Sequence, residues 1–434
     1  MKKLIILYFF LILVIPLGCS TNENKITNWH EYSGFLKSLK SQDTTIKTSV
    51  EIEHNFWLTK MHKHPEQIPY LSRVAFTYTK LFKENGGVKN LVEAEGLLKI
   101  VNNKTHYKNV DFLRALAGIY MSKHQFKESL SMLQKADSLQ KNKRSTNKML
   151  FDVYMELGNF NAAKNKLDKL KYKEDFDFLV RIAKWVDHQG NLNDAIGYMK
   201  SASLLANKSK NKTLICWAYS ALAEYYGHQG KIQLSYDYYL KALKKDPSYL
   251  YALKGIAWIT FSYDKDVKSA KKIIETIYQI RPTPDLLLLK AEFAKFQGEL
   301  SEKKQFISEY QKLLQNKGYA GMYNRHDILL FANDPKKAHK AIQIALQEIK
   351  NRPSPSSYDL LAWAYFNNDQ PVEALKTFKI YVANKPSTPE SEYHKAVLYK
   401  TFGLSKDYLA IKNKLLRENT FELGPNITKI ITEL

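Results

Sequence analysis

Residues 216–249 read CWAYSALAEYYGHQGKIQLSYDYYLKALKKDPSY, and the pattern of this stretch predicts the fold. Its apolar and small residues recur at intervals of three and four, which is typical of amphipathic helices. Gly230 interrupts the pattern and Pro247 ends it, because glycine permits a tight turn and proline cannot continue a helix. The stretch therefore predicts two helices joined by a short turn. Such a pair cannot bury its apolar face alone.

The same arrangement recurs along most of the chain. Small residues return where two helices must approach closely, as at Ala117, Ala183, Ala223 and Ala362. The units begin near residues 110, 144, 176, 216, 250, 284, 319, 355 and 389, and four of the eight spacings are 34 residues. Neighbouring units can bury their apolar faces by stacking, which predicts one continuous all-α repeat structure.

This period and these residue classes resemble the tetratricopeptide (TPR) family, whose 34-residue unit follows the pattern W-x2-L-G-x2-Y, A-x3-F, P. The resemblance covers about residues 107–417, and the unit near 319 shows it mainly through Ala338 and its second helix. It implies a right-handed α-solenoid of about nine to ten stacked helix-turn-helix repeats. The first helix of each repeat would line a concave groove.

The chain divides into four expected segments. Residues 1–18 are a signal peptide, 19–68 a linker and N-terminal cap, 69–417 the TPR solenoid and 418–434 a C-terminal capping helix. A helical pair around Tyr70 and Leu91 starts the solenoid as an atypical unit. The apolar spacing from Ile427 to Leu434 suits a helix that covers the last exposed apolar face.

The first residues form an export signal. Two lysines precede an apolar run from Leu4 to Leu17, and these 14 residues are fewer than the roughly 20 that span a bilayer. Gly18 and Cys19 then resemble the lipobox of bacterial lipoproteins, which implies a lipidated Cys19 and a place in the cell envelope, on a membrane facing the periplasm or the cell surface. The alternative is an ordinary cleaved signal with an incidental cysteine.

No phosphate-binding, nucleophile or zinc-protease motif occurs in the chain, so we expect no enzyme, no cofactor and no metal. A group of acidic and histidine residues spaced as in a strand is the best metal candidate, and we interpret it as a solvated polar stretch: Glu51, Glu53, His54, His62 and His64. The phrase His-Gln-Gly at His188 and His228 reflects shared repeat ancestry. Cys216 is expected to be a buried small residue.

The predicted groove carries rings and carboxylates. The positions that line it hold ten acidic and six basic side chains, although the whole chain has a formal net charge of +23. We predict that at least four of its seven rings are partly exposed on one concave wall. The predicted groove residues are the aromatic Trp217, Tyr251, Trp258, Phe261, Phe296, Trp363 and Phe366 and the acidic Asp187, Glu224 and Glu292.

Three classes of partner fit a basic chain: nucleic acid, an anionic membrane and acidic proteins. A generally basic composition without any such partner also explains the charge, and we favour that explanation. Rings among carboxylates favour a peptide or protein segment, and such a groove would repel phosphate backbones, so no nucleic acid is expected there. The predicted function is therefore a membrane-anchored protein-interaction scaffold. A glycan- or peptidoglycan-binding lipoprotein is the alternative, since sugars also stack on rings.

Overall fold

The structure, a computed structural model, describes residues 25–41, 48–170 and 175–434. Within these ranges the chain is all-helical, with 23 α-helices and one short 3-10 helix, η1 (Lys317–Tyr319). None of the described helices has the length and apolar character needed to cross a membrane. The lipidation site predicted at Cys19 lies outside the described residues, as does the signal peptide.

Twenty of the helices form ten antiparallel pairs, so the all-α solenoid of TPR type is confirmed. The first helices of the pairs are α3 (Ile68–Asn85), α5 (Val110–Ser122), α7 (Lys143–Glu156), α9 (Phe176–His188), α11 (Lys212–His228), α13 (Leu250–Ser262), α15 (Pro284–Gln297), α17 (Asn324–Ala332), α19 (Pro355–Asn367) and α21 (Pro389–Thr401). The second helices are α4 (Val88–Lys104), α6 (Phe126–Ser138), α8 (Phe160–Asp168), α10 (Leu192–Ser209), α12 (Ile232–Lys245), α14 (Val267–Ile280), α16 (Leu300–Leu314), α18 (Ala338–Asn351), α20 (Pro371–Tyr381) and α22 (Ser405–Glu418).

Local chemistry sets the ends of these helices. The side chains of Asp175, Asn211 and Ser354 accept hydrogen bonds from the backbone of the first turn that follows each of them. Gly230 adopts a left-handed conformation with φ 75°, which makes the tight turn between α11 and α12 possible. One unit starts later than its period predicts, because η1 and a loop precede α17, which begins at Asn324 and not near 319.

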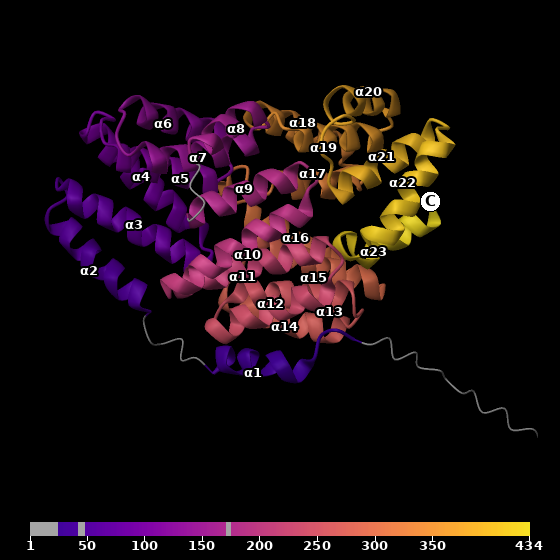
Figure 1. The fold of residues 1–434 in the computed structure, drawn as a ribbon, viewed down its shortest axis with the longest axis horizontal. Helices are drawn as coiled ribbons and strands as arrows, with labels where there is room; N and C mark the ends of the chain where they lie inside the picture. Colours follow the sequence, from indigo (N-terminus) through magenta and orange to yellow (C-terminus); the bar gives the residue numbers. More distant parts are fainter. Residues whose placement is uncertain (1–24, 42–47, 171–174) are drawn as a thin grey trace, which may run out of the picture.

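The solenoid winds tightly enough for successive turns to touch. The backbone N–H of Phe126 donates to Asn351 at 3.1 Å, and Arg352 reaches Glu156 at 3.4 Å. Gly158 lies so close to Ser354 that a Cβ atom on the glycine would be 3.1 Å from the serine Cα. These contacts join the second and third pairs to the eighth and ninth. One superhelical turn therefore takes about six pairs, as the approach of α8 to α18 indicates (Figure 1).

The segment expected as a linker and cap divides in two. Helix α2 (Ser49–Lys63) packs against α3. Helix α1 (Trp29–Lys40) instead lies along α12 and α14, which are about 200 residues further along the chain (Figure 1). Of the residues predicted to suit a strand, Glu51, Glu53, His54 and His62 lie in α2, and His64 follows its last residue, so the strand prediction was wrong. His54 is buried with its Nδ1 2.9 Å from the hydroxyl of Thr77, and Glu53 pairs with Lys80 of α3 at 2.6 Å. These two side chains therefore face the neighbouring helix and not the solvent.

The C-terminal helix α23 (Thr420–Glu433) packs against two different parts of the solenoid. Its second half packs through Ile431 into the apolar cluster of the last pairs. Residues near its start instead contact other first helices: Phe421 bonds to α13, Glu422 to α11 and Asn426 to α15. Gly424, with φ 73° and ψ 168°, and Pro425 break the helix between the halves. Residues 419–426 therefore lie on the concave face, and the chain then runs on to Leu434, whose carbonyl oxygen accepts from Tyr408 of α22.

Candidate functional site

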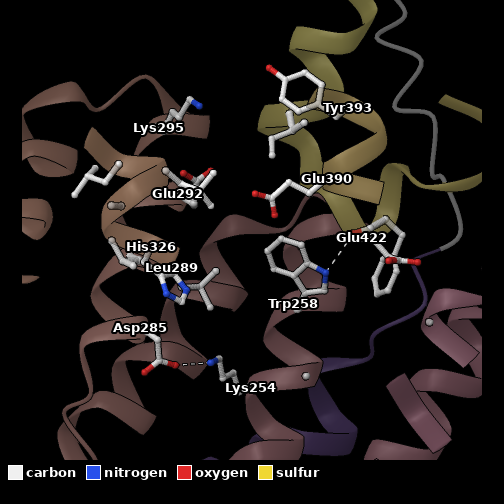
Figure 2. Close-up of a pocket in the computed structure, with 18 of the residues that line it drawn as sticks. Lys254, Trp258, Asp285, Leu289, Glu292, Lys295, His326, Glu390, Tyr393 and Glu422 are labelled. Atoms are coloured by element: carbon white, nitrogen blue, oxygen red, sulfur yellow. Dashed lines mark hydrogen bonds and ion pairs between the residues drawn. The ribbon is translucent and has the colours of Figure 1, made fainter. Parts of the chain in front are cut away.

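The concave face encloses a cavity of about 940 Å³. Figure 2 shows its two walls, with Leu289 and Glu292 on α15 facing Glu390 and Tyr393 on α21. Trp258 of α13 lies between these walls, and its indole N–H donates to the carbonyl oxygen of Phe421 at 3.2 Å (Figure 2). The volume is near the upper end of the roughly 300–1,000 Å³ typical of small-molecule and cofactor pockets.

The C-terminal segment forms one side of the cavity. Besides the bond from Trp258, the Phe421 carbonyl accepts from the hydroxyl of Ser262 at 2.6 Å. Asn426 donates to the backbone carbonyl of Glu292 at 2.9 Å and to its carboxylate at 2.7 Å. Residues from the first helices thus bind an internal segment through its backbone and its polar side chains.

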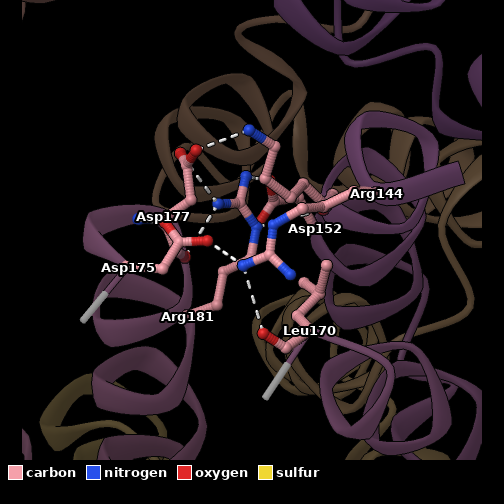
Figure 3. Close-up of polar contacts among 7 residues, drawn as sticks. Arg144, Asp152, Leu170, Asp175, Asp177 and Arg181 are labelled. Carbon is pink, nitrogen blue, oxygen red and sulfur yellow. Dashed lines mark hydrogen bonds and ion pairs between the residues drawn. The ribbon is translucent and has the colours of Figure 1, made fainter. Parts of the chain in front are cut away.

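The inner-face charges largely neutralise one another between neighbouring first helices. Arg181 on α9 contacts Asp152 on α7 at 2.6 Å, and Arg144 donates to the carbonyl of Leu170 at 3.2 Å and also pairs with Asp175 (Figure 3). The same kind of link, from a lysine to an aspartate of the next repeat, joins Lys148 to Asp177 and Lys254 to Asp285. Since Arg181 was outside the groove positions, the excess of acidic residues predicted there overstates the negative charge.

Within the cavity several polar groups stay without a counter-charge. Lys295 and Lys303 line the wall, and neither forms an ion pair with any residue that the structure describes. Burial lowers the pKa of Lys303, and the neighbouring Lys295 lowers it further. Among the described residues, the carboxylate of Glu224 accepts a hydrogen bond from the hydroxyl of Tyr251 alone, and burial raises the pKa of Glu224. The cavity lining therefore carries both positive and negative groups beside apolar residues such as Leu289.

Histidines add hydrogen-bonding atoms to this lining. Burial lowers the pKa of His326 to about 4, so its ring is neutral at pH 7, and its Nδ1 has no hydrogen-bond partner among the described residues. His394 is 3.0 Å from the Asp359 carboxylate through Nδ1 and stacks on Trp363, with ring centroids 4.1 Å apart. The cavity wall is therefore polar as well as aromatic.

The ten predicted groove residues separate into three groups. Five of them line the cavity: Tyr251, Trp258, Trp363, Glu224 and Glu292. Phe261 does not, since it is 1% exposed and packs against Phe293 in the core. Four others lie elsewhere on the inner helices: Trp217, Phe296, Phe366 and Asp187. Tyr393 and His394 on the second wall were not predicted, because Tyr393 was left out of the rings at the groove positions and His394 lies one residue beyond such a position.

His228 links the cavity to the C-terminal segment through a 3.0 Å contact of Nδ1 with the Glu422 carboxylate. This bond raises the pKa of His228 against the effect of burial, and the carboxylates of Glu422, Asp187 and Glu224 raise it further. Because the pKa is raised in the folded protein, the contact stabilises fully below the ordinary value of about 6.5 and weakens as pH rises through the raised value.

We therefore expect the backbone amides of residues 420–424 to exchange more slowly, relative to their intrinsic rates, at pH 6 than at pH 8. Hydrogen–deuterium exchange on the full chain measures this. His228→Gln should abolish the difference. His188→Gln should leave it intact, because His188 occupies the equivalent turn and burial lowers its pKa. An equal difference in both variants would contradict the assignment to His228.

Comparisons with known proteins give distant similarities only. No protein-family model matches the chain, and no curated protein does. A human IFIT1 dimer with PPP-AAAA is 15% identical over 76% of each chain, with a TM-score of 0.47. A Rap protein complexed with competence and sporulation factor is 14% identical over 65% of this chain and 91% of that chain, with a TM-score of 0.46. YrrB, described as a TPR protein with an unusual peptide-binding site, is 15% identical over 45% and 95%, with a TM-score of 0.27.

Proposed function

We propose that this protein is a non-enzymatic interaction scaffold that binds a segment of a protein or peptide in its inner cavity. One observation carries the proposal: the same first helices already hold residues 419–426 of this chain, which form the start of α23 and its break at Gly424. Trp258 and Ser262 bind a backbone carbonyl of the segment, and His228 and Glu292 bind its polar side chains. About 940 Å³ beside this segment remains open.

The lining indicates what the occupant carries. Leu288, Leu289 and Leu329 offer apolar area, and the rings of Trp258 and Tyr393 add flat surfaces suited to aliphatic or aromatic side chains. Lys295 and Lys303 would pair with an acidic group, and Glu224 with a basic one. A chain of mixed charge fits this pattern. A polyanion fits less well, since the carboxylates of Glu224 and Glu292 in the lining form no ion pair with any described residue and would repel it.

The proposed location is the cell envelope, with a lipid anchor at Cys19. The support is the sequence alone: an apolar run of export-signal length, a small residue before the cysteine and a polar stretch after it. The anchor would hold the scaffold at a membrane surface, while the cavity remains free to bind a partner segment.

Filling the cavity tests the binding proposal. Peptides selected on the immobilised full chain from a displayed random library should bind the Leu289→Trp variant at least about tenfold more weakly, or ~1.4 kcal/mol. Leu204→Trp is the matched control, because Leu204 is 64% exposed on α10 and lies outside the cavity. Equal binding by both variants would place the site elsewhere. Selective binding of soluble oligosaccharides without any peptide would favour the glycan alternative.

A further inference from the structure

The described chain begins on the outer face of the middle repeats and is held there firmly. The backbone N–H groups of Ile26 and Thr27 both donate to the Asp264 carboxylate at 2.9 Å. The Tyr236 hydroxyl lies 3.2 Å from both the N–H and the carbonyl oxygen of Asn28. Tyr32 of α1 is 1% exposed within the core cluster that α12 and α14 build. The position of residue 25 on the molecule is therefore fixed.

This outer face is strongly basic. Over residues 25–41, 231–248 and 263–281 the exposed acidic side chains are Glu31 and Glu275 only. The exposed lysines of these segments number ten: Lys25, Lys37, Lys40, Lys231, Lys241, Lys244, Lys245, Lys265, Lys268 and Lys272. We call this surface of α1, α12, α14 and their adjoining loops the basic face. On α22, another second helix, the exposed charges are three basic and two acidic, so the excess is not general.

Chain length connects the basic face to the proposed anchor. Cys19 precedes Lys25 by six residues, and six residues span at most about 22 Å. A lipid on Cys19 would therefore hold the bilayer within that distance of Lys25, whose neighbours are the lysines of α1 and α14. Anionic headgroups attract such side chains at close range, because the Debye length is about 8 Å at physiological salt.

We propose that the basic face lies against an anionic membrane surface and orients the solenoid on it. The inference rests on the anchor of the proposed function for its location, and on the placement of the lysines for its charge. A lipid tether alone limits distance without choosing an orientation. With α1, α12 and α14 toward the lipid, α6 and α8 at the opposite edge of the molecule point away from it (Figure 1).

Orientation can be measured on the full chain. A fluorescent amino acid replaces Gln279, which is exposed on α14, or Lys127, which is exposed on α6. Energy transfer to a headgroup dye is then recorded in vesicles of phosphatidylglycerol and phosphatidylcholine, and in vesicles of phosphatidylcholine alone. We expect several-fold higher transfer from position 279 than from 127 in the anionic vesicles. High salt should remove the difference.

Two variants with four substitutions each distinguish an effect of the basic face from an effect of the protein's overall positive charge. In the first variant, glutamine replaces Lys37, Lys40, Lys244 and Lys245. The higher energy transfer from position 279 in anionic than in neutral vesicles should then disappear, since each lysine strengthens the attraction to the anionic surface about fivefold. Replacing Lys127, Lys135, Lys406 and Lys414 should preserve it. Equal transfer from both positions, or an unchanged preference in the first variant, would overturn the proposal. So would binding to single-stranded nucleic acid that displaces the protein from anionic vesicles.

The anchor is tested separately. Incorporation of a labelled fatty acid into the full chain, and its loss in Cys19→Ser, reports on the lipid alone. Absence of label would remove the anchor from the proposed function. The energy-transfer comparison between anionic and neutral vesicles decides the basic face whether or not Cys19 carries a lipid.

Discussion

Gly255→Ala is expected to destabilise the protein by about 3 kcal/mol, a large effect for one added methyl group. Gly255 lies within α13, where its backbone rests against the ring of Tyr239 on α12. A Cβ atom at this position would be 2.2 Å from Cζ of that ring. Tyr239 is 6% exposed, so its ring can yield only by disturbing the packing between the two repeats.

Gly197→Ala is the matched control, because Gly197 lies within α10 and a Cβ atom there would meet nothing within 4 Å. Alanine is the better helix former, so this variant should be more stable by roughly 1 kcal/mol. Urea unfolding followed by circular dichroism compares both variants with the parent protein. Equal stability of Gly255→Ala and the parent would show that α12 and α13 pack less closely than described.

Arg352→Met is expected to cost about 3–5 kcal/mol, because it leaves the buried carboxylate of Glu348 without its counter-charge. Glu348 is 1% exposed, and its carboxylate accepts from Arg352 Nε at 2.9 Å and from Asn324 at 2.7 Å. Arg352 also reaches Glu156 at 3.4 Å, so the substitution removes a link between successive turns of the solenoid.

Two further variants test the reason for that loss. Glu348→Gln in the Arg352→Met background should recover most of the stability, since the buried group is then neutral. Arg417→Ala should change stability by less than about 1 kcal/mol, because Arg417 and Glu418 form an exposed pair. If the double variant were no more stable than Arg352→Met alone, lost packing and not the stranded charge would be the cause.

The fold was predictable because one period carries it. Repeated small residues at Ala117, Ala183, Ala223 and Ala362 are all buried to 1% exposure or less. Each of these alanines lies where two helices pack closely, either within one pair or between neighbouring pairs, so the contact is local in sequence. The late start of α17 was the exception, since η1 and its loop interrupt the period without any proline or repeat glycine to mark the new helix start.

The site was predictable only in part, because a repeat position does not decide which neighbour a side chain meets. Trp258 and Tyr251 line the cavity, yet Phe261 on the same helix turns into the core. The net charge predicted for the groove was too negative for a similar reason. Arg181 pairs with Asp152 and Arg325 with Glu390, and neither arginine occupies a predicted groove position. Pairing depends on the adjacent helix, which a single repeat does not specify.

The contacts between distant repeats could not be predicted from the sequence. The contact of Asn351 with Phe126 joins residues 225 positions apart, and that of Trp258 with Phe421 joins residues 163 apart. Both depend on the superhelical pitch, which accumulates small rotations over about six pairs. The kink at Gly424 and Pro425 was readable as a helix break, but not as the entry of the chain into its own groove.

If a partner segment occupies the inner cavity, a photoreactive group placed inside that cavity should crosslink to it. A photoreactive amino acid at Leu289, in the cavity wall, is compared in living cells with the same group at Leu204 on the outer surface of α10. We expect a protein adduct from position 289 that is absent from position 204, and whose crosslink maps to one short segment of the partner. Identical adducts from both positions, or an adduct from position 204 alone, would contradict it.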